Sequence, residues 1–227
     1  MWHQSSRKVL IAGWVFMGLM VNGHITQGRT AQPQTGLSAE NVKKIGVLLF
    51  VKGKCDTATE ENLNCPLGRF AFNPENIAPD SDYMITNYVQ EILQKRMGEK
   101  VIPLKKAMNA YIEMPKNEFS DTPRALAQTL GQVLGADLMV AGFVLRYKKR
   151  IGSAMAISEP ASVGFAAYLL NVANGRMLWS ASFSETQHSL SENILDARAF
   201  FKRGAKWLTA DELARYGVNK IFEKFPF

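Results

Sequence analysis

A β-hairpin constrains this chain more than any other local feature of its sequence. Residues 162–187 read SVGFAAYLLNVANGRMLWSASFSETQ, with an apolar run on each side of Asn174-Gly175. Asn-Gly is the strongest two-residue signal for a hairpin turn, so two antiparallel strands are predicted, with Leu170 opposite Trp179. One side of the pair is expected to face the core: Tyr168, Leu170, Val172, Met177, Trp179, Ala181 and Phe183. The other side is expected to be wetter, with Asn171, Arg176, Ser180 and Ser182.

Three further segments predict strands or a loop. Residues 45–51 are a short continuous apolar run, which is typical of a buried strand. Residues 136–147, ADLMVAGFVLRY, are apolar on both faces, which favours a central strand. Residues 100–104, KVIPL, predict a short strand with Pro103 at a sheet edge or at the strand end, because Pro103 cannot donate to a ladder. Residues 52–81 are rich in Pro, Asn and Asp and predict a long loop.

The helices complete the predicted fold. A helix is expected over residues 80–98, another from Thr122 to Gly135, a third around 192–203, and a last one that starts with a capping box of Thr209 and Glu212. Their inward residues are expected to include Leu126, Leu130, Val133 and Leu134, and then Leu213, Val218, Ile221, Phe222 and Phe225. The order β-α-β-α-β-β-β-α-α predicts a mixed α/β fold, with a single mixed sheet of about five strands packed with helices.

The N-terminus predicts export. Arg7 and Lys8 precede an apolar run of thirteen residues, 9–21, which is too short to span a bilayer and fits the core of a signal peptide. Residues 1–28 are therefore expected to be a signal peptide, either cleaved or kept as an anchor, and residues 29–42 a linker. No cysteine follows the apolar run, so the sequence does not predict a lipoprotein.

Cys55 and Cys65 are the only two cysteines. Their separation fits neither a zinc ligand pair nor a C-x-x-C redox motif. In an exported protein, two cysteines this close predict an intramolecular disulfide, with two free thiols as the alternative.

Charge and the lack of reactive clusters limit the function classes. Without residues 1–28 the chain keeps 25 basic and 20 acidic residues, which favours an anionic partner. His188 is then the only histidine and lies in a polar stretch, so no catalytic residue is predicted. The acidic residues 56–61 and 80–82 lack the spacing of a calcium loop, and no glycine-rich phosphate loop occurs. We expect no metal site and no cofactor.

The densest basic cluster is the candidate partner-binding site. It comprises Arg146, Tyr147, Lys148, Lys149 and Arg150, at the end of the predicted central strand. The cluster fits an acidic protein or an anionic surface, but a solvated strand end has the same pattern. Apolar residues between 152 and 165 are a second candidate for the partner face.

Three pieces of the sequence together resemble a known family. They are KIGVLLF (44–50), TLGQVLGADLMVAGFV (129–144) and YLLNVANGRMLWSASFSETQ (168–187). In this order they resemble the soluble domain of the curli secretion protein CsgG, the N-terminal domain of TolB and the penicillin-binding-protein activator lipoproteins. The resemblance covers roughly residues 42–225 and implies one such α/β domain over residues 43–227. It implies non-enzymatic work in envelope assembly, secretion or activation of a partner.

The expected function is therefore that of an exported envelope accessory or assembly protein, periplasmic or associated with the outer membrane. Its expected partner is another envelope protein or an anionic envelope surface, and a homo-oligomer stays open. No nucleic acid is expected as a partner. Two alternatives also stay open, a periplasmic enzyme of unknown reaction and a nucleic-acid-binding α/β module.

Overall fold

The computed structural model describes residues 41–55, 70–71, 77–115, 122–153, 157–187 and 207–227. The predicted signal peptide, His188, the acidic residues 56–61 and the expected helix around 192–203 lie outside these ranges. The predicted linker lies outside them up to residue 40, and Val42 at its end is already buried in the core. No helix among the described residues is long and apolar enough to cross a membrane.

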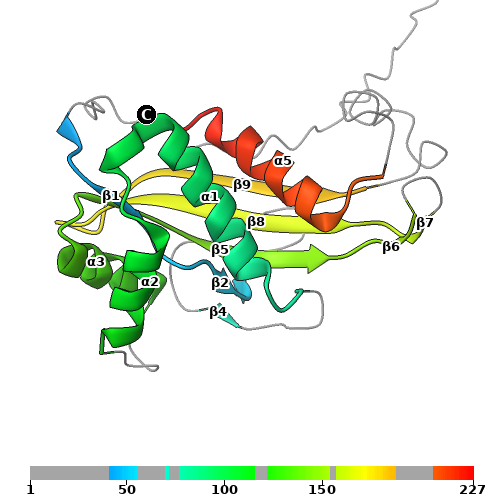
Figure 1. Ribbon diagram of the computed structural model, residues 1–227. Coiled ribbons are helices and arrows are strands. Elements are labelled where there is room, and N and C mark those ends of the chain that lie inside the picture. The colour runs from blue at the N-terminus through cyan, green and yellow to red at the C-terminus, as the bar shows by residue number, and fades with distance from the viewer. Residues whose placement is uncertain (1–40, 56–69, 72–76, 116–121, 154–156, 188–206) are drawn as a thin grey trace, which may run out of the picture.

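The main sheet is mixed, as the sequence predicts (Figure 1). Its strands are β1 (Ile45–Val47), β2 (Val51–Lys52), β5 (Leu138–Lys148), β8 (Ser162–Asn171) and β9 (Met177–Thr186). β1 and β2 both pair parallel with β5, whereas β8 pairs antiparallel with β5 and with β9. The predicted strand over residues 45–51 is thus split in two. At the break, the Phe50 amide donates to the Thr86 hydroxyl over 2.9 Å.

Two small strand pairs accompany the sheet. β3 (Lys54–Cys55) pairs with β4 (Phe70–Ala71), so the predicted loop over 52–81 carries a short ladder. β6 (Ile151–Gly152) pairs with β7 (Ile157–Glu159), and Figure 1 shows this pair at one end of the molecule, beyond α1 and α5.

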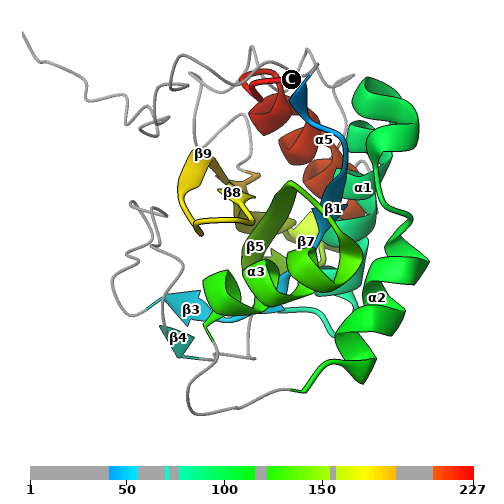
Figure 2. The same ribbon diagram turned by 90° about the vertical axis from the view of Figure 1, so that its left-hand side faces the viewer.

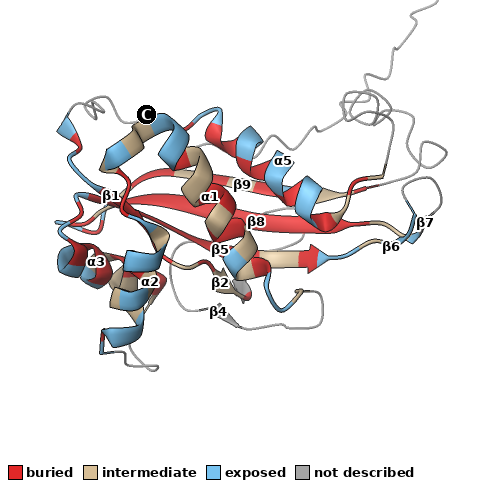
Figure 3. Cartoon of the chain, viewed as in Figure 1, coloured by how far each residue is buried: buried red, intermediate tan, exposed pale blue. Residues whose placement is uncertain are grey.

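The helices pack on both faces of the sheet. α1 (Ser81–Met97) and α5 (Ala210–Phe222) lie on one face, and α2 (Leu104–Glu113) and α3 (Pro123–Leu134) on the other (Figure 2). A hydrophobic cluster fills each interface. Along β5, Val140 and Val144 face the first cluster, while Met139 and Phe143 face the second. The prediction that β5 is central and apolar on both faces is confirmed, and Figure 3 shows the middle strands buried over most of their length.

The hairpin exists, but its predicted register is wrong. Leu169, not Leu170, pairs with Trp179, and Leu170 pairs with Met177. Two features cause the difference. The loop is wider than predicted: the Asn171 carboxamide accepts from the amides of Ala173 and Asn174, and the Val172 amide donates to the Asp137 carbonyl. The register then shifts between Leu169 and Leu170, at a β-bulge that places Leu178 between the partners of these two residues. A slip of one residue sends side chains to opposite faces. The predicted single core face is therefore divided, with Trp179, Ala181 and Phe183 in the α1–α5 cluster, and Tyr168, Leu170 and Val172 in the α2–α3 cluster.

The segment 100–113 also differs from its prediction. Val101 makes only an isolated bridge with Ile45, and Pro103 is the N-cap of α2, a helix that we did not expect. Proline is favoured where a helix starts, because the amide it lacks would have no partner in the first turn. Pro103 therefore marks a helix start rather than a strand edge.

The helix ends agree better with the sequence. α1 ends before Gly98, and α3 is capped by the Thr122 hydroxyl and stopped by Gly135 in the left-handed region. α5 has the predicted capping box of Thr209 and Glu212. The prediction for Val133 is wrong, because 62% of this residue is exposed.

Candidate binding surface

The candidate basic cluster lies where β5 ends, and a β-bulge there decides which side chains face solvent. The register between β5 and β8 shifts between Val144 and Arg146. An extra residue in one strand turns the following side chains to the other face. As a result Tyr147 enters the α1–α5 cluster with 2% of its surface exposed. The structure therefore removes Tyr147 from the predicted binding surface.

Tyr147 anchors this strand end to the start of α5. Its hydroxyl donates a hydrogen bond to a carboxylate oxygen of Asp211, in the first turn of α5. Burial of the side chain, followed by the hydrogen bond and the negative charge of Asp211, raises the pKa of Tyr147. The phenol therefore stays protonated and remains a donor.

The other members of the cluster divide into bound and exposed side chains. Arg150 donates to the Trp207 carbonyl, three residues before α5, and Arg146 donates to the Ser184 hydroxyl on β9 over 2.9 Å. Both arginines are half-buried. They cross-link the strand end to its neighbours rather than project into solvent.

Lys148 and Lys149 are the exposed basic residues of the cluster. The Lys148 ammonium lies 2.8 Å from a carboxylate oxygen of Glu159 on β7. No partner is found for Lys149 among the described residues. Ile151, the first residue of β6, is 55% exposed beside them. The surface that remains is small and mixed: two lysines and one large apolar side chain.

The second predicted partner face, within residues 152–165, is contradicted for the later half of this segment. Ala161, Val163 and Phe165 are fully buried, because β8 runs through the middle of the sheet. Gly152 and Ser158 are exposed and belong to the β6–β7 end of the molecule.

The remaining candidate sites are the acidic segment 80–82 and the two cysteines. Asp82 of the acidic segment 80–82 pairs with Lys52 at 3.4 Å, and Ser81 is buried. Among the described residues no group of three or more His, Cys, Asp or Glu side chains could hold a metal ion. Cys55 ends β3 and Cys65 lies outside the described residues, so the disulfide stays a prediction.

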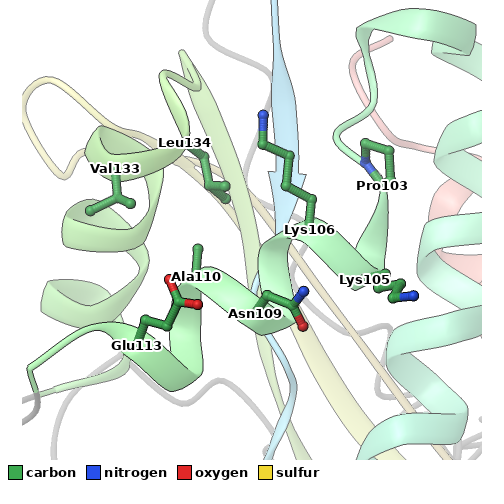
Figure 4. Close-up of a pocket in the computed structure, with 8 residues that line it drawn as sticks. All are labelled: Pro103, Lys105, Lys106, Asn109, Ala110, Glu113, Val133 and Leu134. Atoms are coloured by element: carbon green, nitrogen blue, oxygen red, sulfur yellow. The ribbon is translucent and has the colours of Figure 1, made fainter.

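Sequence reasoning missed a hollow between α2 and α3. Lys105, Lys106 and Val133 are among the residues that line it (Figure 4). Two lysines directly after Pro103-Leu104, followed by apolar residues at helical spacing, were the signal that could have found its α2 side.

Comparisons with known proteins give similarity in structure only. No protein-family model matches the chain, and no curated protein matches it. The PelC dodecamer from Paraburkholderia phytofirmans is 14% identical, covers 86% of this chain and 94% of its own, and has a TM-score of 0.49.

Two further solved structures are also similar. Lipoprotein GNA1162 from Neisseria meningitidis is 16% identical, covers 71% of this chain and 96% of its own, and has a TM-score of 0.41. The C-terminal domain of LpoB from Salmonella enterica is 10% identical, covers 67% of this chain and 87% of its own, and has a TM-score of 0.38. These likenesses concern the course of the chain, and the membership of a CsgG-like family stays a prediction.

Proposed function

We propose that the protein is an exported, non-enzymatic accessory or assembly protein of the cell envelope, similar to CsgG and its relatives. It acts by binding another envelope protein or an anionic envelope surface through the exposed end of β5 and β6. The observation that carries the proposal is the construction of this end. Tyr147 holds it to α5 and Arg150 to Trp207 in the segment before α5, while Lys148, Lys149 and Ile151 face solvent.

This construction suits binding because the strand end already has a fixed conformation before the partner binds. Association costs the side-chain and loop freedom that is lost at the interface, and a preformed surface loses less. α5 is in turn held to α1, since Arg215 pairs with Glu91 at 2.6 Å and lies 4.3 Å from the centre of the Tyr88 ring. The strand end that carries the exposed lysines is therefore supported by two packed helices as well as by the sheet.

The charge of the surface makes the expected interaction electrostatic. Screening shortens the Debye length from about 10 Å at 0.1 M salt to about 3 Å at 1 M, so binding should weaken as salt rises. Ile151 adds an apolar contact that salt does not weaken. A partner with an acidic patch beside an apolar residue would satisfy both.

The test is cross-linking in intact cells with wild type and a Lys148→Glu/Lys149→Glu variant, with the captured component identified by mass spectrometry. We expect the variant to lose capture while its unfolding free energy changes by only about 0.5–1 kcal/mol, because both residues are exposed. The single variant Lys149→Glu leaves the Lys148–Glu159 pair intact and should weaken capture in part.

The matched control reverses Lys43 and Lys44, two adjacent exposed lysines next to Asp137, at the opposite end of β5. This control should capture normally. Equal capture by all variants at low salt would reject the surface, and a cytoplasmic location in fractionated cells would reject the envelope function.

A further inference from the structure

A hollow of about 510 Å³ opens between α2 and α3, on the opposite side of the sheet from α5. Its apolar lining includes Ala110 from α2 and Val133 and Leu134 from α3. Ligand sites in proteins have volumes in the range of roughly 300–1,000 Å³. The hollow is therefore large enough to receive one or two apolar side chains of a partner.

Val133 gives the first sign that something covers this hollow. It is 62% exposed although it belongs to a helix whose other apolar residues pack on the sheet, and Ile112 on α2 is 70% exposed. Two large apolar side chains are thus presented to solvent by neighbouring helices. A β-branched residue also has a lower helix propensity, so the stability of α3 does not explain a valine at this exposed position.

Lys105 and Lys106 give the second sign. They occupy the first turn of α2, which has no acidic residue and no side-chain cap. Positive charge at a helix N-terminus opposes the helix dipole, so these lysines do not stabilise α2. Both are exposed, and neither has an ion-pair partner among the described residues. Their charge is available to an external anion.

Glu113 fixes the polarity of the site. Figure 4 shows it beside α3 at one end of the hollow, whereas Lys105 and Lys106 lie toward Pro103 at the other. An anionic membrane presents negative charge over the whole face and would be repelled at Glu113. A peptide segment can place a carboxylate at one end and a neutral or basic group at the other, so charge complementarity favours a peptide.

We propose that this hollow binds a segment of a partner protein that carries an apolar side chain next to an Asp or Glu. The apolar side chain covers Val133 and Leu134, and the carboxylate faces Lys105 and Lys106. The site is separate from the end of β5 and does not require the binding proposed there.

The experiment uses a display library of random dodecamer peptides, selected on the immobilised full-length protein. We expect the selected peptides to share an acidic residue near Leu, Ile, Val or Phe. Binding of a synthetic selected peptide, followed by fluorescence anisotropy, should be about tenfold or more weaker for Lys105→Glu/Lys106→Glu and clearly weaker for Val133→Ser. The Lys148→Glu/Lys149→Glu variant is the matched control and should bind as wild type does, which separates this site from the proposed function.

Three outcomes would overturn the proposal. The selected peptides could lack the acidic and apolar pattern. They could also bind the Lys105→Glu/Lys106→Glu variant and the Lys148→Glu/Lys149→Glu variant equally well. Vesicles of phosphatidylglycerol could instead bind in a way that depends on Lys105 and Lys106 while the peptides do not, which would make a membrane surface the occupant. Circular dichroism and thermal melting of each variant show that α2 is still folded, because the substituted side chains are exposed.

Discussion

The anchor between β5 and α5 gives a quantitative prediction. Tyr147→Phe removes one hydroxyl from the core and breaks the hydrogen bond to Asp211 without leaving a large cavity. A hydrogen bond to a charged group contributes about 1.5–3 kcal/mol to stability. Asp211 is exposed, so water can replace the lost donor. We therefore expect a loss at the low end, about 1.5 kcal/mol at neutral pH, measured by urea unfolding.

The same substitution should change the pH dependence of stability. The pKa of Tyr147 is raised in the folded protein above the ordinary value of 10.0, mainly by burial. Above about pH 10 the unfolded chain loses this proton while the folded chain keeps it, so the stability of the wild type falls by about 1.4 kcal/mol per pH unit. Tyr147→Phe lacks this loss. The two proteins should thus differ by about 1.5 kcal/mol at neutral pH and by almost nothing at about pH 11.

Two results would refute this reasoning. A constant difference from neutral pH to about pH 11 would mean that Tyr147 ionises equally in both states, and no difference at neutral pH would mean that the bond to Asp211 contributes nothing. Tyr83→Phe is the matched control, because Tyr83 is 48% exposed and its hydroxyl has no partner among the described residues. It should change stability by no more than about 0.5 kcal/mol at neutral pH.

The other two predictions concern the core and the cysteines. Trp179→Ala should lower the unfolding free energy by about 3–5 kcal/mol, since Trp179 is 1% exposed and its ring centre lies 5.4 Å from that of Phe222 and 5.0 Å from that of Phe225; a loss below about 1 kcal/mol in urea unfolding would contradict this packing. Cys55 and Cys65 should form one intramolecular bond in exported protein, seen as a mass change only after reduction and alkylation. Two thiols that react without reduction would disprove it.

Helix ends and the central strand could be predicted because local chemistry determines them. Thr122, Gly135 and the capping box of Thr209 and Glu212 satisfy the backbone groups at helix ends, whatever the rest of the fold does. β5 is apolar at successive positions because helices cover both faces of the sheet. These features depend on neighbouring residues or on composition, and both can be read from the sequence.

The hairpin register could not be predicted, because a distant contact and a β-bulge decide it. Asn174-Gly175 marks the loop, but the Val172 amide bonds the Asp137 carbonyl, and the Val172 side chain packs near Gly131 on α3. These contacts take Val172 out of the strand pair, so the loop begins at Val172 instead of at Asn174, and the bulge at Leu178 then places Trp179 opposite Leu169. A strong local turn signal therefore located the loop without fixing which residues face each other.

The basic cluster shows why charge density along the sequence differs from charge density on the surface. A regular strand through residues 146–150 would place alternate residues on alternate faces, and the bulge after Val144 determines which of them face the core. Tyr147 turns inward and bonds Asp211, and Arg150 reaches Trp207, so both serve to hold the strand end. The exposed lysines owe their fixed position to these two contacts. If the end of β5 binds a partner, Tyr147→Phe should therefore weaken capture without changing surface charge, whereas Lys149→Glu changes the charge and leaves the anchor intact.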